Sequence, residues 1–267
     1  MGMERARLLQ HNDSAMQTLA LFAARKFDAG ATGRLEKVSA QSAADQARLA
    51  WNRSRSDIAV YAAELEQWTG PLNGALPDSV LLRSLSMQPD PSAGAAPNDP
   101  VLATAAQQDE LAKAEWKMER SQWAPTLQGG GFYQTIDGVS PFGGFLIGTA
   151  IPLPGGGQGA RTKAARLRSD IARQQLEELR RSRTTELART RAQWAQLHES
   201  LAYYEGNGAA LAEALRRDAQ RAYLNGEAGY VEFLQGMDQA RNIEEERLGV
   251  RFQTALTVIH LNALTGQ

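Results

Sequence analysis

The chain has 267 residues and no cysteine, and its 29 Lys and Arg nearly balance its 30 Asp and Glu, giving a net charge of −1. These values exclude disulfides, thiolate catalysis and cysteine-based zinc sites, and they leave no basic field for nucleic acid. Only 7% of the residues are aromatic, and Ala and Arg crowd long stretches, so the composition favours long helices over a compact globule.

Two helices joined by a glycine turn are predicted for residues 1–70. The first helix covers residues 4–24, and two glycines in the turn at residues 27–33 supply the backbone freedom to end it. The second helix runs from about residue 35 to residue 68. It ends at a Thr-Gly-Pro sequence because glycine readily closes a helix and proline cannot continue it.

A linker rich in Pro, Gly, Ser and Ala is predicted for residues 71–98, and a second structural unit for residues 99–267. Asp99 and Pro100 are a good N-cap and first-turn pair, so a third helix is expected from Pro100 to about Trp123.

The hydrophobic period changes in residues 126–153, which predict a β-hairpin with strands at 126–136 and 142–153. Strands of this length match those that cross a bilayer at a tilt. A soluble β-element packed on helices is the alternative. In the membrane interpretation, one face of the second strand is expected to contact lipid, through Phe145, Ile147 and Ile151.

A very long helix is predicted for residues 159–223, provided that Gly206 and Gly208 bend it without ending it. Its apolar residues recur at helical spacing from Ala160 onward, as in Ala164, Leu167 and Ile171. A turn at residues 223–230 then leads into a return helix that ends at a Thr-Gly pair.

The chain also repeats itself, because residues 25–70 align without a gap on residues 221–266 at an offset of 196 positions. Two copies of one supersecondary unit explain this match. The identical pairs include Arg25/Arg221, Gly30/Gly226, Gly33/Gly229, Glu36/Glu232, Ala44/Ala240, Thr69/Thr265 and Gly70/Gly266.

Three motifs in this order resemble the TolC-type outer-membrane efflux proteins over nearly the whole chain. They are the strand-to-helix junction IPLPGGGQG at residues 151–159, the turn YLNG with the following YVEFL between residues 223 and 234, and the ending ALTG at residues 263–266. The junction and residues 230–240 look most like the subgroup that works with heavy-metal efflux pumps.

The resemblance implies a mainly α fold with long coiled-coil-like helices and one β-hairpin, which contributes two strands to an oligomeric transmembrane β-barrel. It implies a homotrimer in the outer membrane with a periplasmic extension, a passive duct without catalytic residues or cofactors. No metal site is expected, because the three histidines are far apart in the sequence without ligand spacing. The implied partners are membrane lipid, a periplasmic adaptor protein and an inner-membrane pump of the resistance-nodulation-division type. The turns at the periplasmic tip would contact the adaptor through Asp28, Gly30, Gly33, Arg34, Asn225, Gly226, Glu227 and Gly229.

Proteins of this family have two β-hairpins in each protomer, and the first would lie upstream of Met1. The chain also starts without the apolar region of an export signal, so it looks amino-terminally truncated. Three copies would supply six strands, fewer than the roughly eight of the smallest outer-membrane barrels.

Two other functions are open at this stage. A periplasmic adaptor with a helical hairpin would share the long helices and the tip turns, and a soluble coiled-coil scaffold would need no membrane. A chain that forms a barrel should require detergent, whereas an adaptor or scaffold should not.

Overall fold

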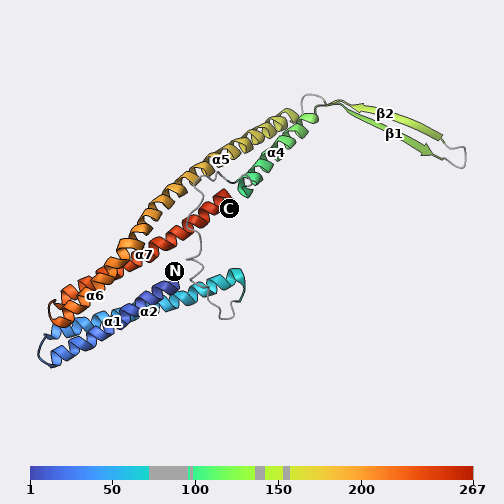
Figure 1. The fold of residues 1–267 in the computed structure, drawn as a ribbon. Coiled ribbons are helices and arrows are strands. Elements are labelled where there is room, and N and C mark those ends of the chain that lie inside the picture. Colours follow the sequence, from blue (N-terminus) through green and yellow to red (C-terminus); the bar gives the residue numbers. More distant parts are fainter. Residues whose placement is uncertain (72–95, 97–98, 136–141, 153–156, 267) are drawn as a thin grey trace. The chain divides into compact units, whose positions relative to one another are not determined.

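The computed structural model describes residues 1–71, 96, 99–135, 142–152 and 157–266 (Figure 1). The chain divides into two compact units, Met1–Pro91 with Arg189–Asn262 and Ser92–Ala188 with Ala263–Gln267. Three predicted features lie wholly or mostly outside the described residues: the linker 71–98, the hairpin connection 137–141 and the glycine run 155–157.

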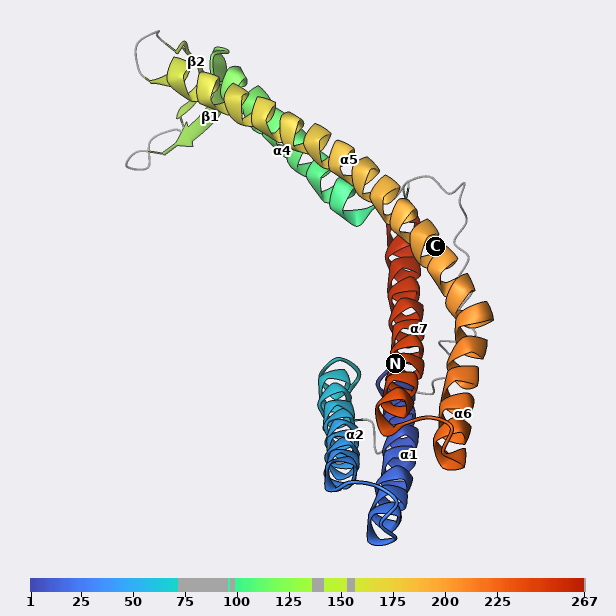
Figure 2. The ribbon, with the colours of Figure 1, turned by 90° about the vertical axis from the view of Figure 1, so that its left-hand side faces the viewer.

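Two helical hairpins form most of the first unit, which also contains the chain from Arg189 to Gly208. α1 (Gly2–Asp28) and α2 (Arg34–Thr69) form one hairpin, and α6 (Ala209–Asn225) and α7 (Tyr230–Thr265) form the other. The turns of both hairpins lie at the same end of this unit (Figures 1 and 2). The two compact units therefore do not coincide with the two sequence repeats, because helices of both repeats pack together here.

The helix bounds confirm the internal repeat. α2 and α7 each contain 36 residues, and both their first and their last residues are separated by the offset of the repeat. The glycine after each helix has a positive φ, 81° at Gly70 and 75° at Gly266. Glycine adopts a positive φ at little cost, so it suits the residue that follows a helix.

One hydrophobic cluster joins the four helices of the two hairpins. Its alanines at positions 23, 40 and 44 have no exposed surface, so α1 and α2 approach closely there, and larger side chains fill the space toward α6 and α7. The buried members are Met16, Leu19, Ala20, Ala23, Ala40, Ala44, Ala47, Tyr223, Tyr230, Phe233 and Met237.

Gly236 brings α7 close to α6, because a Cβ atom placed there would lie 2.8 Å from the Cβ of Ala219. We expect Gly236→Ala to lower the free energy of unfolding by about 1–3 kcal/mol, since overpacking outweighs the better helix propensity of alanine. Gly249→Ala is the matched control in the same helix. It meets no atom within 4 Å and is expected to raise the free energy of unfolding by about 0.5–1 kcal/mol. Chemical denaturation measures the free energy of unfolding of both variants. A change of the same sign in the two variants would contradict the close contact between Gly236 and Ala219.

The predicted long helix is confirmed, with one irregular turn. α5 (Gln158–Tyr203) continues through the π-helical turn η1 (Tyr204–Gly208) into α6. Gly208 is buried at the end of this turn, where a Cβ atom would lie 3.1 Å from Cδ1 of Tyr204 and 3.6 Å from Cγ2 of Ile243 in α7. The two glycines of this segment therefore widen the helix without ending it.

The second unit contains α4 (Pro100–Ser121) and the first part of α5. Asp99 caps α4 as predicted, since its Oδ1 accepts a hydrogen bond of 2.8 Å from the backbone of Val101. Its Oδ2 lies 3.1 Å from Nε of Arg183 in α5. The buried positions of this part of α5 are Ala165, Ser169, Leu176 and Leu187.

Of the apolar residues that revealed the helical period of α5, Leu187 and Leu201 are buried, but those near the start of the helix lie on an exposed face. Leu167 and Ile171 are 55% and 53% exposed in the chain. The sequence pattern thus gives the period of the helix, but it does not identify the buried face.

The hairpin consists of β1 (Thr126–Gln134) and β2 (Phe142–Ala150), which pair antiparallel with Thr126 opposite Ala150. Each strand has nine residues, so it spans about 30 Å. Both strands are shorter than predicted, and the predicted last residues, Ile136 and Leu153, lie outside the described part of the chain. Among the described helices, none combines the length and the apolar character needed to cross a membrane.

Candidate functional site

The two tip turns have the same backbone hydrogen bonds. In the first, the amide of Gly30 donates to the carbonyl of Phe27 over 2.9 Å, and the next amide donates to the residue before Phe27 over 2.8 Å. In the second, Gly226 donates to Tyr223 over 3.2 Å, and the next amide again donates to the residue before Tyr223, over 2.8 Å. The φ angles of Gly30 and Gly226 are 71° and 77°, so both turns need glycine at this position.

The residues predicted to contact an adaptor lie together at these two turns, and all of them are exposed. Around them, Asp28 forms an ion pair of 3.3 Å with Lys37, and the amide of Gly229 donates a hydrogen bond of 3.0 Å to the carboxylate of Glu232. The exposed residues are Asp28, Gly30, Gly33, Arg34, Asn225, Gly226, Glu227 and Gly229. Their contact with a partner remains a prediction.

A hydrogen bond next to the turns links a helix of one repeat to a helix of the other. The hydroxyl of Tyr223, at the end of α6, donates to Oε1 of Glu36 in α2 over 2.5 Å. Thr32 also donates to the Glu36 carboxylate, and Nζ of Lys26 lies 4.4 Å from the centre of the Tyr223 ring. The ring is 2% exposed and packs edge-on against Phe22 at 5.7 Å between centroids. The ring also lies 5.2 Å from that of Phe233 in α7, so Tyr223 contacts residues of α1, α2 and α7 from its own place in α6.

The surroundings of the hydrogen bond between Tyr223 and Glu36 shift the pKa values of both side chains. Burial opposes the ionisation of Glu36, but hydrogen bonds from Thr32 and Tyr223 and the charge of Lys26 outweigh it and lower the pKa of Glu36 below 4.5. Burial and the Glu36 carboxylate raise the pKa of Tyr223, so its phenol stays protonated and can donate. At neutral pH the protonated phenol of Tyr223 is therefore the donor and the ionised carboxylate of Glu36 is the acceptor.

We expect the stability of the tip to depend on pH through Glu36. Its folded pKa lies below the unfolded value of 4.5, so its contribution is present above pH 4.5 and is lost as the pH falls through the folded pKa. Glu36→Gln should remove part of the acid destabilisation, which thermal unfolding over a pH series measures. The contribution would be refuted if the wild type and Glu36→Gln lost stability in parallel below pH 4.5.

The faces of the hairpin differ in polarity. The register places Gly129 opposite Ile147 and Gly131 opposite Phe145, so these side chains share one face with Leu127. Phe145, Ile147 and Leu127 are 94%, 82% and 80% exposed. The other face carries the polar side chains of Thr126, Gln128 and Gln134, and there the ring of Phe132 covers Gly144. Ile151, predicted on the apolar face, lies just beyond β2 and is 65% exposed.

Comparison with protein families gives a match between residues 94–267 and the model of the outer membrane efflux protein family. The chain belongs to this family. Channels of the outer membrane efflux protein family are trimeric parts of tripartite pumps and are not enzymes, which agrees with the predicted absence of catalytic residues. A search of curated proteins gave no match.

Solved structures share the fold with this outer membrane efflux protein. CusC matches with a TM-score of 0.84 and 17% identity, over 99% of this chain and 64% of CusC. VceC from Vibrio cholerae matches with a TM-score of 0.82 and 14% identity, over 99% and 66%. A membrane protein from Pseudomonas aeruginosa matches with a TM-score of 0.79 and 20% identity, over 99% and 62%. The chain therefore spans less than two thirds of the length of these proteins.

The sequence of this outer membrane efflux protein did not predict the tie between Glu36 and Tyr223. A signal was present in the repeat, because Tyr223 stands where the first copy has Phe27, which lacks a hydroxyl. The glutamates at the equivalent positions of the two repeats, Glu36 and Glu232, accept hydrogen bonds from different parts of the chain. Glu36 accepts from the other repeat, whereas Glu232 caps the start of its own helix.

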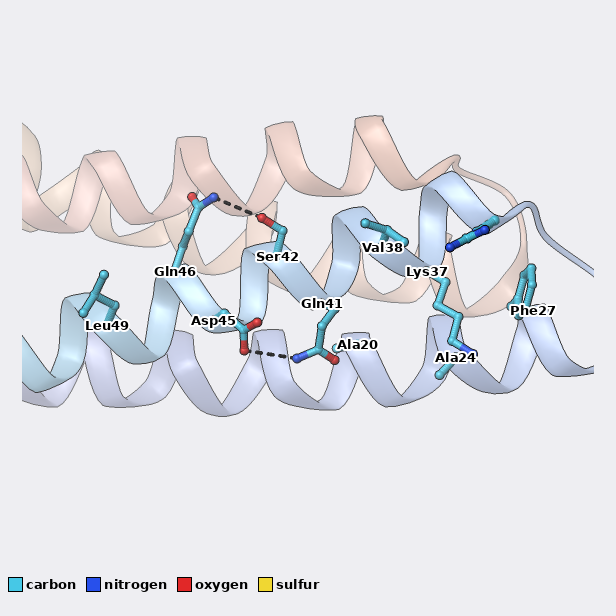
Figure 3. A pocket seen from close by; sticks show the side chains of 11 residues that line it. Ala20, Ala24, Phe27, Lys37, Val38, Gln41, Ser42, Asp45, Gln46 and Leu49 are labelled. Atoms are coloured by element: carbon cyan, nitrogen blue, oxygen red, sulfur yellow. Dashed lines mark hydrogen bonds between the residues drawn. The ribbon is translucent and has the colours of Figure 1, made fainter.

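A surface groove of about 750 Å³ lies beside the first turn, between α1 and α2 (Figure 3). Apolar side chains such as Phe27 and Val38 line it together with polar ones, among them Lys37 and Gln41. Within the described ranges, no group of three or more His, Asp or Glu side chains could hold a metal ion.

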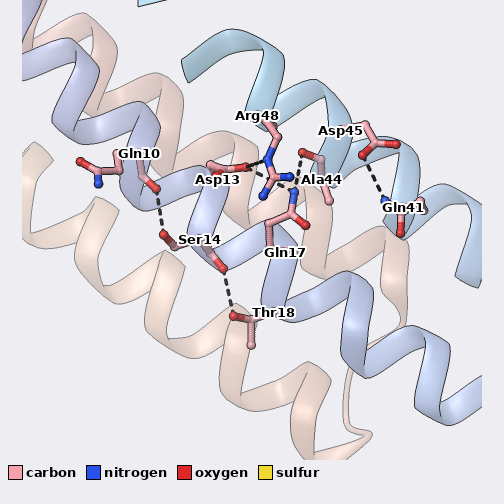
Figure 4. Close-up of polar contacts among 9 residues, drawn as sticks. All are labelled: Gln10, Asp13, Ser14, Gln17, Thr18, Gln41, Ala44, Asp45 and Arg48. Carbon is pink, nitrogen blue, oxygen red and sulfur yellow. Dashed lines mark hydrogen bonds and ion pairs between the residues drawn. The ribbon is translucent and has the colours of Figure 1, made fainter. Parts of the chain in front are cut away.

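Polar contacts hold α1 and α2 together farther from the turn (Figure 4). The amide of Gln17 donates to the carbonyl of Ala44 over 3.3 Å, and Asp13 lies 3.8 Å from Nε of Arg48. Asp13 is 6% exposed, so this contact compensates a buried charge.

Proposed function

We propose that the chain is part of an outer-membrane efflux channel and serves as a passive exit duct for small solutes. The observation that carries this proposal is the hairpin with one apolar and one partly polar face in a chain of the outer membrane efflux protein family. A strand pair of this kind can meet lipid on one side and water on the other when it joins other strands.

In this proposal the hairpin lies in the outer membrane and the helices extend into the periplasm. Three copies of the chain assemble, and an adaptor protein contacts the paired tip turns. The exposed polar residues at both turns and the groove between α1 and α2 support such a contact, because they offer side chains of both signs beside an apolar surface. An inner-membrane pump of the resistance-nodulation-division type supplies the energy.

The proposal includes heavy-metal cations among the transported solutes. Its support is the resemblance of residues 151–159 and 230–240 to the heavy-metal efflux subgroup. The chain should then raise the tolerance of a channel-deficient bacterium to metal salts more than its tolerance to organic toxicants. Tolerance to organic toxicants alone would refute this part of the proposal.

Site-directed spin labelling tests the membrane placement, and the absence of cysteine makes single labels straightforward. Labels at Phe145, Ile147 and Thr149 should be relaxed mainly by oxygen, which concentrates in lipid. Labels at Leu146 and Gly148 should be relaxed more by a polar agent, because they point to the other face.

A label at an exposed tip residue, Asp28, is the control for full access to water. Equal access of the polar agent to both faces of β2 would refute the channel and favour an adaptor or a soluble scaffold.

A further inference from the structure

Basic side chains gather where the helices of the second unit meet the hairpin. α4 ends at Ser121, five residues before β1 begins, and α5 begins at Gln158, eight residues after β2 ends. Figure 1 shows that α4 and α5 run side by side to this end of the unit. We call the exposed cations nearest to it the basic surface: Lys117, Arg120, Arg161, Lys163, Arg166 and Arg168.

None of these six cations forms an ion pair with another described residue. Cations farther along the same helices do, such as Lys113 with Asp109 at 2.7 Å and Arg173 with Asp170 at 3.2 Å. The nearby Glu119 accepts a hydrogen bond of 3.1 Å from Gln158 and forms no ion pair with these cations. The six side chains of the basic surface are therefore not held by an ion pair within the described chain and can contact an anion.

The charge is local, because the whole chain has a net charge of −1. Residues 161–169 contain four basic residues and no acidic one. An anion that binds here is thus recognised by this segment and not by the overall charge of the protein.

The geometry of α5 directs these side chains toward the hairpin. Cα–Cβ bonds in a helix tilt toward its N-terminus, which in α5 is the end next to β2. At about 1.5 Å per residue, Arg168 lies roughly 15 Å from the start of the helix, and its long side chain can reach back along it. The four cations of α5 can therefore place their charges near the level where the strands end.

An aromatic residue lies at the same end of the second unit, between the helices and the hairpin. Trp123 lies between α4 and β1, and its indole nitrogen donates to Oγ1 of Thr162 over 3.2 Å. The ring is 40% exposed and lies against Gly159 at the start of α5. Tryptophan with one polar and one apolar side is typical of the boundary between hydrocarbon and headgroups.

We propose that the basic surface binds the headgroups of anionic phospholipids in the leaflet that faces the helices. This inference rests on the proposed function, since it requires the hairpin to lie in the bilayer. Guanidinium groups match the oxygen atoms of a phosphate in pairs, and clusters of four to eight basic residues beside a membrane segment are typical of anionic lipid binding. The contact would set the depth of the hairpin in the membrane.

Vesicle binding tests the proposal with the full chain. The purified protein is mixed with vesicles of phosphatidylcholine, with or without phosphatidylglycerol, and the bound fraction is measured by co-sedimentation. The wild type should bind the anionic vesicles at least about tenfold more tightly, and salt should weaken this preference. The variant Arg161→Gln/Lys163→Gln/Arg166→Gln/Arg168→Gln should lose the preference and retain its helical circular dichroism, because glutamine is also a good helix former.

The matched control removes four exposed cations farther along the same helix, as Arg173→Gln/Arg180→Gln/Arg181→Gln/Arg189→Gln. It should keep the preference. An absent preference in the wild type, or an equal loss in both variants, overturns the basic surface as a lipid site.

Protease protection of the hairpin in the same vesicles reports separately on the proposed function. A hairpin protected equally in both vesicle types, without a preference in binding, overturns the lipid site and leaves the channel in place. A hairpin that stays accessible in both types overturns the channel, whatever the preference.

Discussion

Replacing Tyr223 by alanine is expected to lower the free energy of unfolding of the helical tip by about 3–5 kcal/mol. The ring is 2% exposed, lies 5.2 Å from Phe233 between centroids and contacts helices of both repeats, so its removal leaves a cavity among four helices. Urea denaturation measures the change. Tyr203→Ala is the matched control, because this tyrosine is 53% exposed and should cost less than about 1 kcal/mol.

Tyr223→Phe separates the hydroxyl from the ring and gives the second repeat the residue of the first. Glu36 keeps Thr32 and Lys26 as partners, so we expect a smaller loss of about 1–3 kcal/mol. Hydrogen exchange should rise at both turns, since the bond links α2 to α6. Faster exchange at only one turn, or no loss of stability, would contradict a tie between the repeats.

Replacing Ile147 by arginine is expected to cost about 2–4 kcal/mol of folding free energy in a bilayer, since a lipid-facing cation near the midplane is expensive. Ile147 lies near the middle of β2 on the apolar face and is 82% exposed in the chain. The measurement is a urea titration of the protein folded into vesicles.

Leu146→Arg is the matched control, because this neighbour lies on the face that carries Gln128 and Gln134. It should cost clearly less, since that face is expected to meet water. Equal costs for the two arginine variants would show that neither face of the hairpin is specific for lipid.

Much of the fold could be predicted from the sequence because its signals are local. The glycines at positions 30, 70, 226 and 266 adopt the positive φ that ends the four helices preceding them. The hairpin was predicted from two segments rich in Gly, aromatic and β-branched residues on either side of a turn sequence, although both strands are shorter than predicted. The resemblance to TolC-type proteins agrees with the family match.

Parts of the candidate site could not be predicted in the same way. The exposed positions of the tip residues follow from their place in two turns, but the turns come together only because α1, α2, α6 and α7 share one core. The basic residues of α5 were visible one by one in the sequence. The contact of Trp123 with the start of α5, and the pairing of α4 with α5 at this end, appear only in the folded chain.

The sequence by itself determined the repeat, the periods of the helices and strands, and the positions of the turns, because backbone preferences and hydrophobic spacing act over a few residues. Only the tertiary structure decided which face of each helix is buried, as Leu167 shows, and which side chains of the two repeats meet. Glu36 and Tyr223 are 187 positions apart in the chain, and no local preference encodes a contact that depends on how two helical hairpins pack.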